Sequence, residues 1–271
     1  MWVDNGYCKL CLIYSRTKDL VTLGYSHKVS KLLVKLAEIV EKESGRSKAF
    51  AEAFEYVKVL TGSSDPYAET KKGLREIGKS VARIAERYLE AVNWDIREAM
   101  RLSAAANIID TSVLGYENTR SFEEALWDKP VIEDPVELKK HEEVHLVLDN
   151  AGEAEIDKLL AKSLVKHGYK VTLVVREKAY EIDETIESLE KEGIEVMATP
   201  ESMPPVIFID RGFVIAKGIA NAEAYAEAGK VESLHLFRAK CEVIARRLGI
   251  PKNSVLILTG TSVKKLFGRE P

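Results

Sequence analysis

The sequence has few cysteines, few aromatic residues and no long apolar run. Three cysteines among 271 residues are too few for the disulfide framework of a small secreted domain. No apolar segment approaches the roughly 18 residues that span a bilayer, and the first residues lack the apolar core of a signal peptide. We therefore expect a cytoplasmic protein without a membrane partner.

An excess of positive charge is also absent. Lys and Arg total 40 against 43 Asp and Glu, which gives a net charge of −3. Nucleic-acid-binding domains usually carry a basic patch, so we expect no nucleic-acid partner. With 46% hydrophobic residues, the chain can bury one large core or two ordinary ones. Its composition leaves the oligomeric state open.

Residues 1–141 have the apolar spacing of helices. Apolar side chains recur every three or four positions over 29–40, 50–60 and 74–89, which predicts amphipathic helices. A fourth helix is expected from Asp95 to about residue 108, followed by a long connection with one short helix at 111–135. The first half of the chain is therefore predicted to be a helical domain.

From residue 142 onward, short Val- and Ile-rich runs alternate with helical segments. Strands are expected at 144–148, 171–175, 194–198, 206–209, 213–216 and 255–258, and helices at about 153–167, 184–193, 220–228 and 235–248. Such alternation predicts a mostly parallel sheet with right-handed crossovers. The expected fold class is α/β, with a helical domain over 1–141 and a mostly parallel sheet domain over 142–271.

The most informative segment runs from the first expected strand into the next helix. Asp149 and Asn150 follow the strand directly, and Glu153 lies in the first helical turn. Ligands bind at the carboxyl ends of parallel strands, where helix N-termini favour anions. A carboxylate there would repel phosphate unless a divalent cation lay between them. The alternative is that Asp149 and Asn150 only cap the helix.

Polar residues also follow two further expected strands. Asp183 comes after the second strand and would lie beside Asp149 if consecutive strands are neighbours. Lys217 and Gly218 end a later strand, where an ammonium and open backbone N–H groups suit phosphate, and Asn221 is grouped with them as a candidate substrate contact. A helix cap at Asp183 and a solvated Lys217 beside a glycine turn remain equally simple interpretations.

Three more polar residues lie within or at the end of expected helices. Lys240 falls mid-helix among apolar residues, where a buried ammonium needs an anionic partner or else extends to the surface. Asn107 and Asp110 share one face at the end of the fourth helix. They are candidates for contacts to substrate hydroxyls, or they only terminate the helix.

The cysteines allow several interpretations. Cys8 and Cys11 form a single CxxC pair, and Cys241 lies far along the chain. A structural zinc site needs four ligands, and a redox pair would lack the usual βαβ context. Two buried thiols one helical turn apart are the simplest interpretation.

Taken together, these segments resemble the damage-control phosphatases, long known as domain of unknown function eighty-nine. The CxxC pair resembles that of their prokaryotic type, and the resemblance spans residues 8 to about 258. It implies a helical N-terminal part packed on a Rossmann-like α/β part. Six motifs occur in the family's order: Cys8-x-x-Cys11, Asp65-Pro66-Tyr67-x-x-x-Lys71, Asn107-x-x-Asp110, Asp149-Asn150-Ala-Gly-Glu153, Lys217-Gly218-x-x-Asn221-x-Glu223 and Lys240-Cys241.

The resemblance implies a divalent cation, Mg²⁺, Mn²⁺, Co²⁺ or Ni²⁺, held by Asp149, Asn150 and Asp183. Around the position of Asp183 the family often has Asn-Asp-x-Thr, whereas this chain has Ile182-Asp183-Glu184-Thr185. The ligand is therefore kept while a neighbouring amide is lost.

The same resemblance aligns Lys240 with a phosphate-binding lysine and Glu153 with an acidic residue near the substrate. Asn107 and Asp110 align with polar groups that line the pocket. Residues 199–211 are shorter than in many relatives, so no loop contact is carried over there.

The expected function is a metal-dependent phosphatase that hydrolyses small phosphorylated metabolites, such as sugar phosphates or damaged side products. A Rossmann-like methyltransferase is the first alternative, although the first strand lacks a GxGxxG turn. A metabolite-binding protein with a structural metal and a thiol-centred redox or zinc role are the others.

Overall fold

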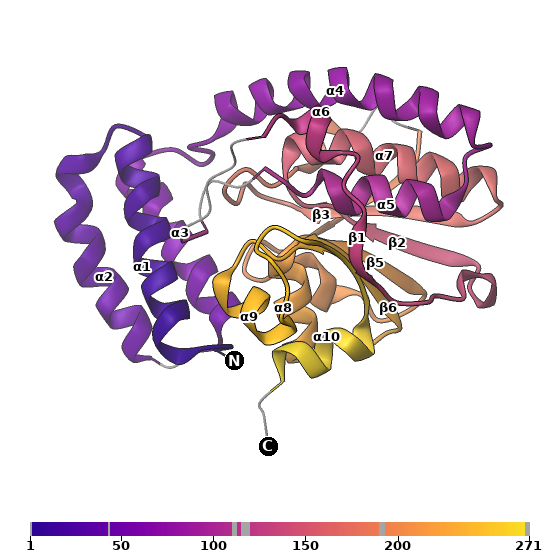
Figure 1. The fold of residues 1–271 in the computed structure, drawn as a ribbon. Coiled ribbons are helices and arrows are strands. Elements are labelled where there is room, and N and C mark those ends of the chain that lie inside the picture. Colours follow the sequence, from indigo (N-terminus) through magenta and orange to yellow (C-terminus); the bar gives the residue numbers. More distant parts are fainter. Residues whose placement is uncertain (1, 43, 110–112, 115–119, 190–192, 269–271) are drawn as a thin grey trace.

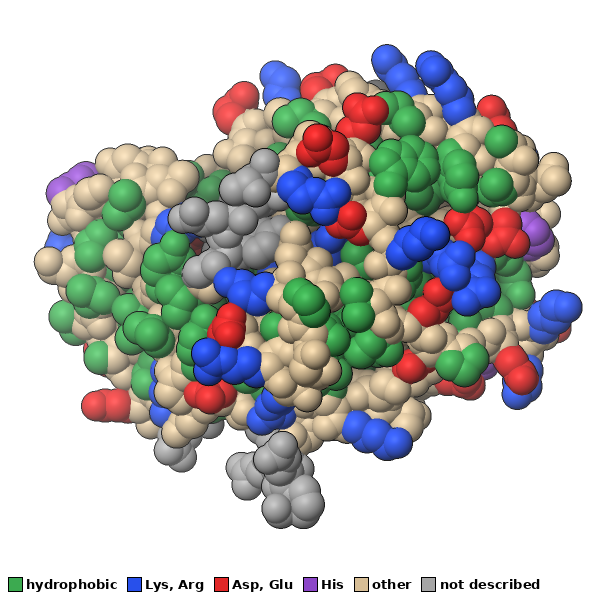
Figure 2. Space-filling view, viewed as in Figure 1, with side chains coloured by type: hydrophobic (Ala, Val, Ile, Leu, Met, Phe, Trp, Pro, Cys, Tyr) green, Lys and Arg blue, Asp and Glu red, His purple; other side chains and the backbone are tan. Residues whose placement is uncertain are grey.

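The structure is a computed structural model, and it describes residues 2–42, 44–109, 113–114, 120–189 and 193–268. Figure 1 shows a helical lobe, coloured indigo to purple, beside a sheet covered by helices. Among the described residues, none of the helices combines the length and apolar character that a bilayer span requires. On the face drawn in Figure 2, basic and acidic side chains are interspersed.

The centre of the fold is a seven-stranded sheet of order β1-β7-β6-β5-β2-β3-β4. Only the β6–β7 pair is antiparallel among the pairings of these strands. The mostly parallel α/β fold expected from the sequence is therefore confirmed. The strands are β1 Pro130–Glu133, β2 Glu143–Val147, β3 Lys170–Arg176, β4 Glu195–Thr199, β5 Phe213–Lys217, β6 Ser233–Arg238 and β7 Val255–Thr259.

Helices cover both faces of this sheet. One core packs α4, α5 and α7 against Leu146, Leu173 and Ile215 of the sheet, and a second core packs α8 and α10 against Val147 and Val174 on the opposite face. Strands buried on both faces are typical of parallel sheets. The helices are α1 Asn5–Thr22, α2 Val29–Glu41, α3 Arg46–Thr61, α4 Ala68–Ala91, α5 Ile96–Ala106, α6 Phe122–Ala125, α7 Ala151–Lys166, α8 Ile219–Ala228, α9 Glu242–Leu248 and α10 Gly260–Phe267.

The first three helices form a lobe with its own core. Leu12, Leu32, Phe54 and Val57 are fully buried there, as the helical spacing predicts. Helices α4 and α5 and strand β1 also belong to the first 141 residues, but they pack on the sheet (Figure 1). The division at residues 141 and 142 stays a prediction, and the helical part contributes both to the lobe and to one layer over the sheet.

Two expected helices are wrong in whole or in part. The expected helix at 235–248 is strand β6 followed by the shorter α9. All six residues of β6 are buried, so the strand shows no alternation of apolar and polar residues that would distinguish it from a helix. The described part of 184–193 forms the 3-10 turn Ile186–Ser188 and has no α-helix.

Two strand expectations also differ from the structure. Residues 206–209 were expected to form a strand, but Pro205–Phe208 forms a 3-10 turn with a proline at its start. Strand β1 lies in the connection expected to be irregular, and it is only four residues long, at the edge of the sheet. Short edge strands carry too little pattern to be recognised.

Helices α4 and α7 approach closely because each has a glycine at the crossing. A Cβ atom on Gly78 would overlap the carbonyl oxygen of Gly152, and one on Gly152 would lie 2.8 Å from the carbonyl oxygen of Leu74. Helix α7 begins directly after Asn150. This crossing therefore fixes the helix whose N-terminus carries Asn150 and Glu153.

We predict that Gly78→Ala lowers the free energy of unfolding by about 1–3 kcal/mol, because the helices must move apart. Gly73→Ala in the same helix is the matched control: its Cβ meets nothing within 4 Å, so it should add about 0.5–1 kcal/mol through helix propensity. Urea denaturation of both variants measures the difference. Equal effects would contradict a tight crossing.

Candidate active site

The turns that follow β2 and β3 are joined by backbone hydrogen bonds. Asn150 and Asp183 form an isolated antiparallel bridge. The N–H of Ala151 donates to the carbonyl of Ile182 at 2.9 Å, and the N–H of Glu184 donates to the carbonyl of Asp149 at 2.7 Å. Since β2 and β3 are parallel neighbours, the carboxyl ends of both strands meet at one edge, as expected from the sequence.

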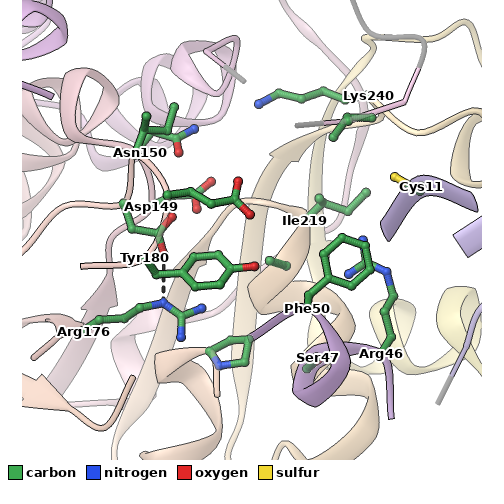
Figure 3. Close-up of a pocket in the computed structure, with 16 residues that line it drawn as sticks. Cys11, Arg46, Ser47, Phe50, Asp149, Asn150, Arg176, Tyr180, Ile219 and Lys240 are labelled. Carbon is green, nitrogen blue, oxygen red and sulfur yellow. Dashed lines mark hydrogen bonds and ion pairs between the residues drawn. The ribbon is translucent and has the colours of Figure 1, made fainter. Parts of the chain in front are cut away.

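A pocket lies at this edge, between the sheet and the helical lobe. Asp149, Asn150, Asp183 and Lys240 line it, and the space accessible to a water-sized sphere is about 80 Å³. Figure 3 shows Asp149 and Asn150 on one side of the pocket, with Arg46, Ser47 and Phe50 of α3 on the other. Four of the residues expected at the site are thus brought together.

Asn107 and Glu153 form a buried network directly behind the pocket. The Asn107 amide donates to the Glu153 carboxylate at 2.7 Å and to the Asp149 carboxylate at 3.1 Å. Glu153 also accepts from the Ile109 N–H at 3.0 Å and from the Asn150 amide at 3.1 Å. These two residues therefore position the pocket residues. Asp110, their expected companion, lies outside the described residues.

Lys240 lies in the pocket, although not on a helix as the sequence pattern suggested. It follows β6 and precedes α9, it is 2% exposed, and its ammonium donates to the carbonyl of Ile109 at 2.8 Å. The carboxyl end of a strand brings the ammonium to the same edge of the sheet as Asp149.

Lys217, Gly218 and Asn221 lie beneath the pocket and do not line it. The ammonium of Lys217 pairs with Asp157 at 3.2 Å and is fully buried. The Asn221 amide donates to the Lys217 carbonyl at 2.9 Å. At Gly218 the backbone has φ of 77°, and a Cβ atom there would overlap the Asp149 carboxylate. Gly218 therefore leaves the space that the Asp149 side chain occupies.

Burial and mutual repulsion raise the pKa of the acidic groups. The pKa of Asp149 is well above its usual range because of burial, and the carboxyls of Asp183 and Glu153 raise it further. Burial also raises the pKa values of Glu153 and Asp183. The ammonium groups of Lys240 and Lys217 act in the opposite direction. The site thus concentrates negative charge that nearby cations only partly offset.

Arg176 and Arg46 are cations of the pocket that the sequence motifs did not indicate. The Arg176 guanidinium donates to Asp183 at 2.9 Å and to the carbonyl of Met203 at 2.7 Å. Arg46 forms an ion pair with Glu223. Arg176 ends β3 directly before the Asp183 turn, a placement that could have indicated it, whereas Arg46 lies far from every motif in the sequence.

The three cysteines are free, and Cys11 lines the pocket. Burial raises the pKa of Cys8 and Cys11, and it raises that of Cys241 to about 11, so the thiols are protonated at neutral pH. Within the described part of the chain, no group of three or more His, Cys, Asp or Glu side chains is placed to hold a metal ion. A three-thiol zinc site therefore receives no support.

A family model for the damage-control phosphatase ARMT1-like domain matches residues 8–199 of the chain. The chain belongs to the damage-control phosphatase family. The match begins at the CxxC pair and includes both turns of the candidate active site, so the resemblance seen in the sequence is confirmed. Membership places the chain in a family of phosphatases.

Curated members of the damage-control phosphatases cover most of the chain. It is 30% identical over 220 residues to damage-control phosphatase PH1575 of Pyrococcus horikoshii, which covers 73% of the chain and 75% of that protein. It is 28% identical over 214 residues to a damage-control phosphatase of Archaeoglobus fulgidus, covering 70% and 74%.

A solved structure supports the fold. The crystal structure of the DUF89 family protein PH1575 superposes with a TM-score of 0.77 at 24% identity, covering 93% of this chain and 97% of that one. Because 93% of the chain is covered, the likeness extends beyond residue 199, where the family model ends. The Rossmann-like expectation is consistent with this fold.

We predict that the contribution of Asp149 to the stability of the metal-free protein falls as the pH rises above the ordinary Asp pKa of 3.8. A carboxyl whose pKa is raised in the folded state stabilises the fold fully when the pH lies below its unfolded-state pKa. This contribution is lost as the pH rises through the raised folded-state pKa. A folded-state pKa that lies one pH unit above the unfolded-state pKa corresponds to about 1.4 kcal/mol.

Thermal unfolding between pH 4 and 8 with chelator checks this, comparing wild type with Asp149→Asn. The Tm advantage of the variant should grow with pH. Asp210→Asn, at an exposed position, controls for the loss of one negative charge. A Tm difference that stays constant across the range would contradict the raised pKa of Asp149.

Proposed function

We propose that this protein is a metal-dependent phosphomonoester hydrolase that acts on small phosphorylated metabolites, such as sugar phosphates or damaged side products. The observation that carries the proposal is the meeting of Asp149, Asn150 and Asp183 with Lys240 in one pocket. Family membership supports the phosphatase class.

The donor set fits a divalent cation. Two carboxylates and one amide oxygen suit Mg²⁺ or Mn²⁺, with Co²⁺ and Ni²⁺ as alternatives. The Asn150 nitrogen donates to the Ile109 carbonyl at 2.7 Å and to Glu153, which directs the amide oxygen away from both. Burial raises the pKa of Asp149, and the neighbouring carboxyls of Asp183 and Glu153 raise it further. A bound cation would favour the ionised form of Asp149. Asp149, Asn150 and Asp183 would be the ligands.

A divalent cation held there supplies a Lewis acid for a phosphoryl oxygen and lowers the pKa of water. The chain's own residues hold the phosphate and orient it. The Lys240 ammonium is fixed by the Ile109 carbonyl and offsets charge that develops on the phosphoryl oxygens. Burial of the pocket strengthens this attraction, because the surroundings have a low dielectric constant.

The remaining residues position this machinery. Arg176 orients Asp183 through its ion pair, and Asn107 holds Asp149. Glu153 is fully buried and accepts from three N–H donors. These contacts favour a positioning role for Glu153 over that of a base. Lys217 contributes positive charge from beneath the pocket, paired with Asp157.

We predict that Asp149→Ala abolishes hydrolysis of p-nitrophenyl phosphate in protein that has been stripped of metal and reloaded with Mg²⁺ or Mn²⁺. The loss should exceed about a thousandfold in kcat/KM, since one ligand and its charge are removed. Asp210→Ala is the control and should keep wild-type rates. Calorimetric titration of metal binding gives a second readout, and far-UV circular dichroism checks that the variant is folded.

Undiminished turnover by Asp149→Ala would refute the assigned site. Tight binding of phosphorylated metabolites without release of phosphate would indicate the non-catalytic alternative. A panel of sugar and cofactor phosphates, screened with Mg²⁺, Mn²⁺, Co²⁺ and Ni²⁺, then identifies the substrate and the preferred ion.

A further inference from the structure

The N-terminus of α3 borders the pocket on the side away from Asp149 and Asn150 (Figure 3). This helix is 16 residues long and begins after Gly45, with no acidic residue in its first turn and no capping side chain among the described residues. The first N–H groups of such a helix have no partner within it, and its dipole favours negative charge. An anion at this point would therefore be stabilised.

Two buried polar atoms at the same place have no hydrogen-bond partner in the part of the chain that the structure describes. One is the hydroxyl of Ser47, which lines the pocket on a residue that is 6% exposed. The other is the buried Nε of Arg46. Burying a donor without a partner is unfavourable, because its hydrogen bond to water is lost and not replaced. Two such donors beside an uncapped helix N-terminus indicate that a ligand supplies the missing acceptor.

The Arg46 guanidinium is held in place from two sides. One terminal nitrogen pairs with Glu223 of α8, and the group stacks on Phe50 with its central carbon 4.3 Å from the ring centre. The planar fork of arginine presents several N–H groups in fixed directions. Glu223 pairs with one terminal nitrogen and so orients the guanidinium. The Nε atom of Arg46 is left without a partner among the described residues.

Two acidic residues that line the pocket are paired with other cations. Glu181 forms an ion pair with Arg16, and Asp183 forms one with Arg176. Glu223 is paired with Arg46 itself. The α3 end of the pocket therefore offers donors, whereas the β2 and β3 end concentrates carboxylates.

We propose that the N-terminus of α3, with Arg46 and Ser47, binds a second anionic group of the substrate, a carboxylate or a second phosphate. The inference rests on the proposed function, in which the scissile phosphate lies at Asp149, Asn150, Asp183 and Lys240. The substrate class is then a small phosphomonoester that carries negative charge at both ends. A polyol phosphate would offer these donors only uncharged hydroxyl oxygens, which gain less from the helix N-terminus and from Arg46 than an anion does.

The test compares two phosphomonoesters of nearly equal size, 2-phosphoglycolate and 2-hydroxyethyl phosphate, which differ in a carboxylate against a hydroxymethyl group. Wild type should prefer the acid by at least about tenfold in kcat/KM, because a charge-assisted hydrogen bond is made only with it. The preference should appear in KM.

Ser47→Ala removes one donor and should lower kcat/KM for the acid by about 10- to 100-fold, with little change for the neutral ester. Ser47→Asp suits the helix dipole but repels an anion, so it should abolish the preference while keeping the Tm. Lys48→Ala is the matched control, since Lys48 is the next residue in the helix and its side chain is exposed. This variant should keep the preference for the acid.

Equal loss on both substrates, or an unchanged preference in Ser47→Asp, would overturn the inference. Absence of turnover of any phosphoester by wild type would instead refute the phosphatase proposal. In that case calorimetric binding of the same two compounds still decides: wild type should bind the acid more tightly than the neutral ester, and Ser47→Asp should bind them equally.

Discussion

The structure depends on placing three acidic side chains, Asp149, Glu153 and Asp183, within one buried region. Their burial is unfavourable, and their raised pKa values reflect it. The surrounding contacts limit that cost: Arg176 pairs with Asp183, and Asn107 donates to both other carboxylates. A fold that needed only stability would place apolar residues here, since buried charge is weak support for stability. The phosphatase chemistry proposed for the pocket would account for the arrangement.

The helical lobe takes part in the same arrangement. Arg16 of α1 is fully buried and pairs with both Asp19 and Glu181. Glu181 has a φ of 44°, a conformation that is uncommon for a residue with a side chain. It lies two residues before Asp183. The lobe thus holds the turn that presents Asp183, and through α3 it also provides the opposite wall of the pocket.

Much of the fold and part of the site could be predicted from the sequence. Asp149 and Asn150 were identifiable because they lie just beyond the end of one strand, and Asp183 because it lies in the turn after the next strand. The carboxyl ends of neighbouring parallel strands meet at one edge of a sheet. Lys240 was assigned to a helix because β6 is buried throughout and shows no alternation. Arg46 and Ser47 could not be found, since their proximity to the pocket depends on how the lobe packs, which no local pattern encodes. The pairing of Lys217 with Asp157 is likewise a tertiary contact.

Gly218 has a consequence for comparing homologous proteins. Its missing Cβ leaves the volume that the Asp149 carboxylate fills, so any larger residue at this position would displace that side chain even where every acidic and amide group is retained. A homologue with alanine or serine here would therefore keep every acidic and amide group of the pocket while its Asp149 carboxylate lay elsewhere. This one backbone position thus deserves the same weight as the acidic residues when homologous sequences are compared.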